Sequence, residues 1–150
     1  MKFTVFISSL LALSAPVFAT PVLTTVTVAY DQKYDVGSTS LNTVACSDGT
    51  NGLVTRGYST FGSLPKFPYI GAAYAVTGYN SPACGSCWSL TYNNGRTSKS
   101  INITAIDRAG ADSFNIALSA MNALTNNQAI HLGRVDVTAK QVAPSSCGFK

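Results

Sequence analysis

Residues 87–106 read CWSLTYNNGRTSKSINITAI and contain two short strand patterns separated by a turn. The first pattern covers residues 87–92 and the second covers residues 100–106, where apolar and polar side chains alternate. Between them lies Asn94-Gly95, a pair typical of hairpin turns because both residues tolerate a positive φ angle. This stretch therefore predicts a β-hairpin and a fold rich in strands.

The rest of the chain adds short strands and one helix. Residues 25–30 alternate threonines with apolar side chains, and residues 73–76 and 133–142 are two further strand candidates. Residues 65–68 contain two prolines and cannot be a central strand. Residues 115–124 carry one apolar helical stripe, which Asp112, Ser113 or Asn115 would cap. The pattern predicts a mainly β fold, a small barrel with one or two short helices beside it.

Composition limits the classes of function. The chain has 150 residues, enough for one domain, and with 46% hydrophobic and 11% charged residues it is neither disordered nor a coiled coil. It has six aspartates, no glutamate and one histidine, so any carboxylate chemistry must use an aspartate. The basic residues are scattered without a run, which argues against a nucleic-acid partner.

The first 19 residues have the pattern of a secretory signal peptide. Lys2 precedes an apolar stretch over residues 3–13, and Val17-Phe18-Ala19 places small residues where signal peptidase cuts. We therefore expect a signal peptide over residues 1–19, a mature domain over residues 20–150 and an extracellular or cell-wall location. The apolar stretch is too short for a membrane span, and an N-terminal anchor is the alternative.

Secretion makes the four cysteines a disulfide framework, for which three pairings are possible. Pairing Cys46 with Cys84 and Cys87 with Cys147 would close two long loops, whereas pairing Cys46 with Cys87 is an open alternative. A redox role for the Cys84-Gly85-Ser86-Cys87 motif is disfavoured, because no βαβ pattern surrounds it and an exported chain meets oxidising conditions.

Nine short stretches are distributed along most of the mature chain, from residue 30 to residue 135. In chain order they are residues 30–35 (YDQKYD), 40–52 (SLNTVACSDGTNG), 57–68 (GYSTFGSLPKFP), 78–81 (GYNS), 84–88 (CGSCW), 105–107 (AID), 114–116 (FNI), 120–125 (AMNALT) and 132–135 (LGRV). In this order the stretches resemble the cerato-platanin family of small secreted fungal proteins.

The resemblance implies a six-stranded double-psi β-barrel like the first domain of expansins, with disulfides Cys46–Cys84 and Cys87–Cys147. It also implies a protein of the cell wall that binds chitin-type oligosaccharides, elicits plant defence and loosens wall polysaccharide without hydrolysis. A host receptor and a monomeric state are further expectations, and no cofactor is expected.

Related double-psi barrels include endoglucanases, which need a general acid and a general base on either side of the glycosidic bond. In barrels of that kind the acid resembles an aspartate in a Phe-Asp-hydrophobic context at the start of the helix. This chain has Phe114-Asn115-Ile116 there. Because asparagine does not titrate, the resemblance predicts a non-catalytic protein in which the Asn115 amide binds sugar.

Five residues are candidates for binding carbohydrate. Asp31 and Asp107 each end a predicted strand, Asn115 is the asparagine discussed above, and two tyrosines are flanked by polar residues, namely Tyr30 and Tyr34. Asp107 is expected at the mouth of the barrel near Asn115. Its alternative role is a structural acceptor for the backbone of the loop at residues 109–110. The alternative for Asp31 is an ordinary turn residue, and Asp35 is expected in a turn or on the surface.

Other motifs point to structural roles. His131 has no nucleophile or metal-ligand partner at a useful spacing, so no metal site is expected. Trp88, Phe61 and Phe114 are expected in the core. Residues 102–104 form a glycosylation sequon, which makes Asn102 a possible modification site or an ordinary strand residue.

Three hypotheses for function follow. The leading hypothesis is a secreted protein that binds N-acetylglucosamine oligomers without cleaving them. A weak glycoside hydrolase would use Asp107 and Asp31 on β-1,4-glucan. A surface-active, self-assembling protein would rely on the apolar, weakly charged composition.

Overall fold

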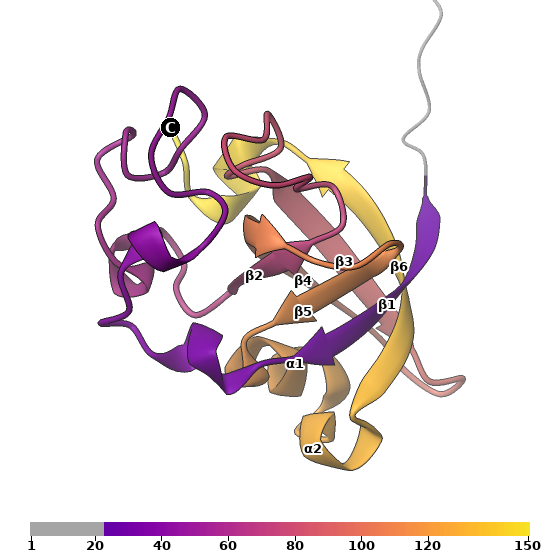
Figure 1. Ribbon diagram of the computed structural model, residues 1–150. Coiled ribbons are helices and arrows are strands. Elements are labelled where there is room, and N and C mark those ends of the chain that lie inside the picture. The colour runs from indigo at the N-terminus through magenta and orange to yellow at the C-terminus, as the bar shows by residue number, and fades with distance from the viewer. Residues whose placement is uncertain (1–22) are drawn as a thin grey trace, which may run out of the picture.

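Six strands form a closed barrel in the computed structural model, which describes residues 23–150 (Figure 1). The predicted signal peptide at residues 1–19 lies outside these residues. The strands are β1 (Thr24–Tyr30), β2 (Ile70–Ala73), β3 (Cys87–Asn93), β4 (Ser98–Arg108), β5 (Ser113–Ile116) and β6 (Arg134–Val142). Around the barrel their order is β1-β5-β2-β4-β3-β6, and β6 pairs with β1 to close it. The predicted mainly β barrel is therefore confirmed.

Short helices fill the connections between strands. The α-helices are α1 (Leu118–Thr125) and α2 (Ala129–Leu132), and the 3-10 helices are η1 (Gln32–Asp35), η2 (Leu41–Thr43), η3 (Phe61–Ser63) and η4 (Pro144–Cys147). In Figure 1 both α-helices lie below the barrel, and the long connection between β1 and β2 lies to its left. No helix in the described part of the chain is long and apolar enough to cross a membrane.

The predicted hairpin is present, and two other expectations are corrected. β3 and β4 pair antiparallel from Cys87 opposite Thr104 to Asn93 opposite Ser98. The strand expected over residues 73–76 instead ends at Ala73, because residues 70–73 are the ones that pair with β4 and β5. The helix expected from Asn115 begins at Leu118, because residues 113–116 form β5.

β5 is held between two strands that are distant in the sequence. It pairs parallel with β1 and antiparallel with β2, and β2 in turn pairs parallel with β4. Gly71 permits the close approach of β2 to β5, since a Cβ there would lie 2.5 Å from the Asn115 carbonyl oxygen and 2.6 Å from the Ile116 Cα. A side chain at Gly71 would therefore displace the backbone that carries Asn115.

The barrel interior is packed with apolar side chains. The three aromatic residues expected in the core, Trp88, Phe61 and Phe114, are all buried. Trp88 and Phe114 pack edge to face with ring centroids 5.5 Å apart, and the indole N–H of Trp88 donates to Ser86 Oγ at 2.9 Å. The core therefore leaves no tryptophan face for a ligand.

The four cysteines form the pairs that the family resemblance implied. Cys46 is bonded to Cys84, and Cys87 is bonded to Cys147. The first bond ties the long β1–β2 connection to the segment before β3. The second ties the start of β3 to η4 near the end of the chain. Both bonds therefore fix loops onto the barrel.

Asp35 caps α1 across 83 residues of sequence. Its carboxylate accepts hydrogen bonds from the backbone N–H of Leu118 at 2.7 Å and of Ser119 at 3.0 Å, and also from the Ser119 hydroxyl. Ala117, the residue at the helix N-cap, has no side chain that can do this. The expectation that one of Asp112, Ser113 and Asn115 would cap the helix is wrong, because these residues precede or belong to β5.

We predict that Asp35→Ala lowers the free energy of unfolding by about 1 to 2 kcal/mol, because two N–H groups at the start of α1 lose their acceptor. Chemical denaturation measures the change. Asp136→Ala is the control, since Asp136 is exposed on β6 and its carboxylate accepts no hydrogen bond from the described residues. Equal losses in the two variants would contradict the capping role.

Candidate functional site

Asp107 is the second-to-last residue of β4. It lies at the end of the barrel where β4 meets the loop that leads to β5. It is placed opposite Ala72 of β2, just after an irregularity in the pairing of β2 with β4. The preceding residues, Ile103 to Ile106, are fully buried, whereas the Asp107 side chain is 19% exposed. The apolar strand thus delivers one carboxylate to the rim of the barrel.

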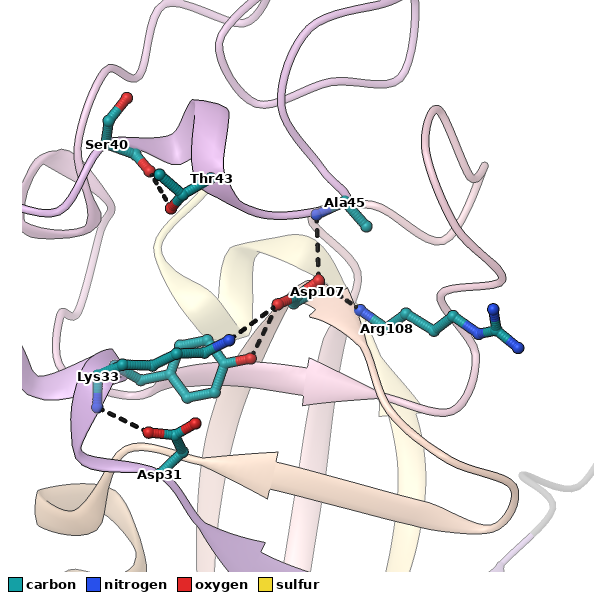
Figure 2. A network of polar contacts seen from close by, with 8 residues as sticks. Asp31, Lys33, Ser40, Thr43, Ala45, Asp107 and Arg108 are labelled. Carbon is teal, nitrogen blue, oxygen red and sulfur yellow. Dashed lines mark hydrogen bonds and ion pairs between the residues drawn. The ribbon is translucent and has the colours of Figure 1, made fainter.

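Four donors surround the Asp107 carboxylate (Figure 2). One oxygen accepts from the backbone N–H of Ala45 at 3.1 Å and of Arg108 at 2.9 Å. The other accepts from the Tyr34 hydroxyl at 3.0 Å and from Lys33 Nζ at 3.4 Å. Two oxygens offer about four acceptor positions, so this carboxylate is saturated.

The structural role of Asp107 differs from the alternative predicted from the sequence. Its backbone partners are Ala45 and Arg108, whereas the N–H of Ala109 donates to the Ala73 carbonyl. The bond to Ala45 fixes the residue before Cys46 and so positions the long β1–β2 connection. Asp107 therefore joins β4 to that connection.

Tyr34 is buried, in contrast to the expectation that its ring would face a groove. Only 1% of the residue is exposed, and its ring packs against Phe61 with centroids 5.9 Å apart. The turn of η1 directs the Tyr34 ring inward, and the adjacent Lys33 side chain lies over that ring. Burial, followed by the nearby Asp107 carboxylate, raises the pKa of Tyr34 well above its ordinary value. The hydroxyl therefore stays protonated and donates to Asp107.

A hollow of about 550 Å³ opens beside Asp107, and we call it the Asp107 groove. Its polar lining comes from β1, η1, the end of β4, β5 and the start of β6, and comprises Tyr30, Lys33, Tyr34, Asp107, Arg108, Ser113, Asn115 and Arg134. The structure thus brings four of the five predicted binding residues, all except Asp31, to one place.

Asn115 is a lining residue whose side chain has unused hydrogen-bonding capacity. Its backbone is fixed in β5 between Ala29 of β1 and Ala72 of β2. The side-chain amide is half-buried and makes no hydrogen bond with any other residue in the range 23–150. An amide offers two donors and an acceptor, so Asn115 can both donate to and accept from a ligand.

Asp31 lies just outside the groove. Its side chain accepts from the backbone N–H of Lys33 at 2.9 Å and so caps η1. The Lys33 side chain turns toward Asp107, and its ammonium lies 4.7 Å from the centre of the Tyr34 ring (Figure 2). These contacts of Asp31 are those of an ordinary turn residue, the alternative given for it above. Asp107 is therefore the one carboxylate in the groove lining.

Three cations in the groove were not among the predicted site residues. Lys33, Arg108 and Arg134 line it together with the single carboxylate of Asp107. Arg134 Nη1 donates to Thr27 Oγ1 at 2.8 Å, whereas the Arg108 guanidinium makes no hydrogen bond within the described chain. Lys33 precedes Tyr34 and Arg108 follows Asp107, so both lie next to predicted site residues in the sequence. Arg134 gives no such signal, because it reaches the groove only through the pairing of β6 with β1.

The remaining candidate residues lie elsewhere. Asn102, the sequon asparagine, is half-buried on β4, where its Nδ2 donates to the Ser146 carbonyl at 3.4 Å. His131 is exposed on α2. Within residues 23–150, no three side chains of histidine, cysteine or acidic type gather in a way that would hold a metal ion.

Comparisons with family models, protein sequences and solved structures all lead to the same protein family. The family model described as Cerato-platanin matches residues 26–149. The chain is 50% identical to the allergen Asp f 15 homolog of Arthroderma benhamiae, over all of this chain and 71% of that protein. Cerato-platanin 2 from M. perniciosa superposes with a TM-score of 0.79 and 49% identity, over 84% of this chain and 100% of the other. The solution structure of the fungal elicitor cerato-platanin gives a TM-score of 0.71 and 38% identity, over 81% and 96%.

Proposed function

Because the chain belongs to the cerato-platanin family, we propose that it is a secreted, non-catalytic protein that binds cell-wall polysaccharide in the Asp107 groove. The ligand class is a β-1,4-linked oligomer of N-acetylglucosamine. In this proposal the protein elicits plant defence through a host receptor and loosens wall polysaccharide as expansins do. The observation that carries the proposal is a groove with one saturated carboxylate and several free donors.

The donors suit the acceptor groups of an acetylated sugar. Lys33, Arg108 and the Asn115 amide all offer N–H groups to the groove. The acetamido carbonyl of N-acetylglucosamine is a strong acceptor, and a hydrogen bond from a charged donor contributes more than a neutral one. Tyr30, half-exposed at the end of β1, adds an aromatic face beside these donors.

The same geometry argues against hydrolysis. An inverting glycosidase holds its two carboxyl groups roughly 6.5 to 9.5 Å apart across the bond, and a retaining enzyme holds them about 5 Å apart. Asp107 supplies the one carboxylate in the groove lining, and four hydrogen-bond donors already occupy it. Asp31 is engaged with the backbone of Lys33. Asp107 therefore has no free position for a proton transfer to sugar, and Asp31 is not in the groove lining.

The direct test is chemical-shift perturbation of the ¹⁵N-labelled protein with an N-acetylglucosamine tetramer. We expect saturable shifts at the backbone amides of Arg108, Asn115 and Lys33. Shifts confined to other faces of the barrel would overturn the proposal, as would no shift at all. Release of reducing ends from soluble β-1,4-glucan, abolished by Asp107→Asn, would favour the hydrolase instead.

We predict that Asn115→Ala weakens binding of the tetramer about fivefold to tenfold, the effect of losing about 1 kcal/mol of hydrogen bonding. Because the amide has no hydrogen-bond partner among residues 23–150, the free energy of unfolding should change little. Calorimetric titration measures the affinity. Asn42→Ala is the matched control, since Asn42 is exposed on η2 away from the groove and uses only its backbone N–H. Equal affinity of both variants and the unmodified chain would contradict a role for Asn115.

A further inference from the structure

A second hollow lies where the end of the chain meets the β1–β2 connection, and we call it the C-terminal groove. Its volume is about 670 Å³, larger than that of the Asp107 groove. The lining comes from three separate segments and comprises Arg56, Tyr58, Pro65, Pro144, Phe149 and Lys150, together with Gly148. It shares no residue with the Asp107 groove.

The walls of the C-terminal groove are held in place by several contacts. The rings of Tyr58 and Phe149 pack edge to face with centroids 5.6 Å apart. Gly148 has a φ of +87°, and a Cβ on it would lie 2.8 Å from Pro65 Cβ, so the two segments touch directly. The adjacent Cys147 is bonded to Cys87 of β3. The groove is therefore a built concavity with two partly exposed aromatic rings.

The charged side chains in and beside this groove are all basic. Arg56 and Lys150 line it, and Lys66 lies beside Pro65 with its Nζ donating to the Ser146 carbonyl at 2.9 Å. No aspartate is in the lining. Among the described residues the one ion pair is Lys33–Asp107, which belongs to the other groove. These cations therefore have no carboxylate side chain paired with them.

Arg56 is oriented but not saturated. Its Nη2 donates to the carbonyls of Asn51 at 3.2 Å and Cys84 at 3.1 Å, which fixes the plane of the guanidinium. Within residues 23–150 its Nε and Nη1 make no hydrogen bond. Each of these free N–H groups can donate a charge-assisted hydrogen bond to a carboxylate oxygen, and such a bond is stronger than one between neutral groups.

We propose that the C-terminal groove binds a carboxylate-bearing sugar, a hexuronate unit of an acidic polysaccharide. The carboxylate would pair with Arg56 beside Lys66 and Lys150, and the apolar face of the pyranose ring would lie against Tyr58 or Phe149. This site is separate from the Asp107 groove and takes a different class of polymer. The protein would then contact two wall components at once, one neutral and one acidic.

The test uses tetragalacturonate as probe, with the fully methyl-esterified tetramer as its neutral counterpart. At low ionic strength we expect saturable chemical shifts at Tyr58, Gly148 and Phe149 with the acid, and binding at least tenfold weaker with the ester. Raising the salt concentration should weaken binding of the acid, since exposed charges are screened. Equal binding of acid and ester, or shifts in the Asp107 groove alone, would overturn the proposal.

Two variants and a control test the residues involved. Arg56→Gln should weaken binding of tetragalacturonate about tenfold, and Phe149→Leu should weaken it severalfold. Arg96→Gln removes the same charge from the exposed turn between β3 and β4 and should change it less than twofold. If Arg96→Gln weakens binding as much as Arg56→Gln, the attraction is one of net charge and the site is refuted. Equal shifts with inorganic phosphate would show a simple anion site and refute the sugar.

Discussion

Asp107→Ala is expected to lower the free energy of unfolding by about 3 kcal/mol and to abolish measurable binding of N-acetylglucosamine oligomers. The stability loss follows from the donors that the carboxylate satisfies. The Tyr34 hydroxyl is buried, and after the substitution it and the Ala45 N–H would have no protein acceptor. The loss of binding follows because Asp107 orients the Lys33 ammonium and ties the β1–β2 connection, at Ala45, to the end of β4. Urea denaturation and calorimetric titration measure the two effects.

Asp107→Asn separates the two roles of the side chain. One amide oxygen can still accept from the Ala45 and Arg108 N–H groups, so the stability loss should be about half that of alanine. Its NH₂ group would face Lys33 Nζ and the Tyr34 hydroxyl, so the groove should remain disturbed. Alanine and asparagine variants that bind as tightly as the unmodified chain while folded would show that Asp107 acts on stability alone.

Replacing Cys87 and Cys147 together with alanine should lower the free energy of unfolding by up to about 4 kcal/mol, because a loop with a sequence separation of 60 residues is no longer closed in the unfolded chain. It should also release η4 and the segment that contains Phe149, and so abolish binding in the C-terminal groove. Thermal denaturation, with the unmodified chain under reducing conditions beside it, measures the stability.

The Cys46 and Cys84 pair provides the comparison for this prediction. Its sequence separation is 38 residues, so its removal should destabilise the chain by a similar amount. Its ligand effect should differ, because this bond anchors the β1–β2 connection, which contacts Asp107 at Ala45 and also carries Arg56, so binding in both grooves should weaken. If removing the Cys87–Cys147 bond weakened binding in the Asp107 groove as much as removing the Cys46–Cys84 bond, the expected difference between the two bonds would be refuted.

Local patterns in the sequence predict the hairpin of β3 and β4, the first strand and β6 well. Each has a run of alternating side chains long enough to be distinct. β5 was missed because Ile116 also fits the helical stripe that continues through Ala120 and Leu124. Its four residues form a strand only because β1 and β2 pair with them on both sides. β2 was misplaced because residues 69–76 are almost uniformly apolar and give no boundary.

The sequence predicted that Asp107 and Asn115 lie near each other, but it did not predict their contacts or that Asp31 lies outside the groove. The expectation that Asp107 lies near Asn115 rested on the end of an apolar strand and on the family resemblance, and both residues line one groove. Tyr34 was assigned an exposed ring because its neighbours are polar, yet a 3-10 turn points that ring inward against Phe61. Asp35 reaches α1 and Arg134 reaches the groove through contacts between distant segments, which a local pattern does not contain.

The closed order of the six strands restricts how copies of this protein can associate. Each strand in the described chain pairs with a neighbour on both sides over part of its length, and β4 has a one-sided stretch at residues 98–103, which pair with β3 alone. Addition of a strand from another molecule along the full length of a barrel strand therefore requires the barrel to open first. A film or oligomer of the intact fold is expected to be held together mainly by side chains and loops, and mild detergent or high salt should dissolve it without denaturing the protein.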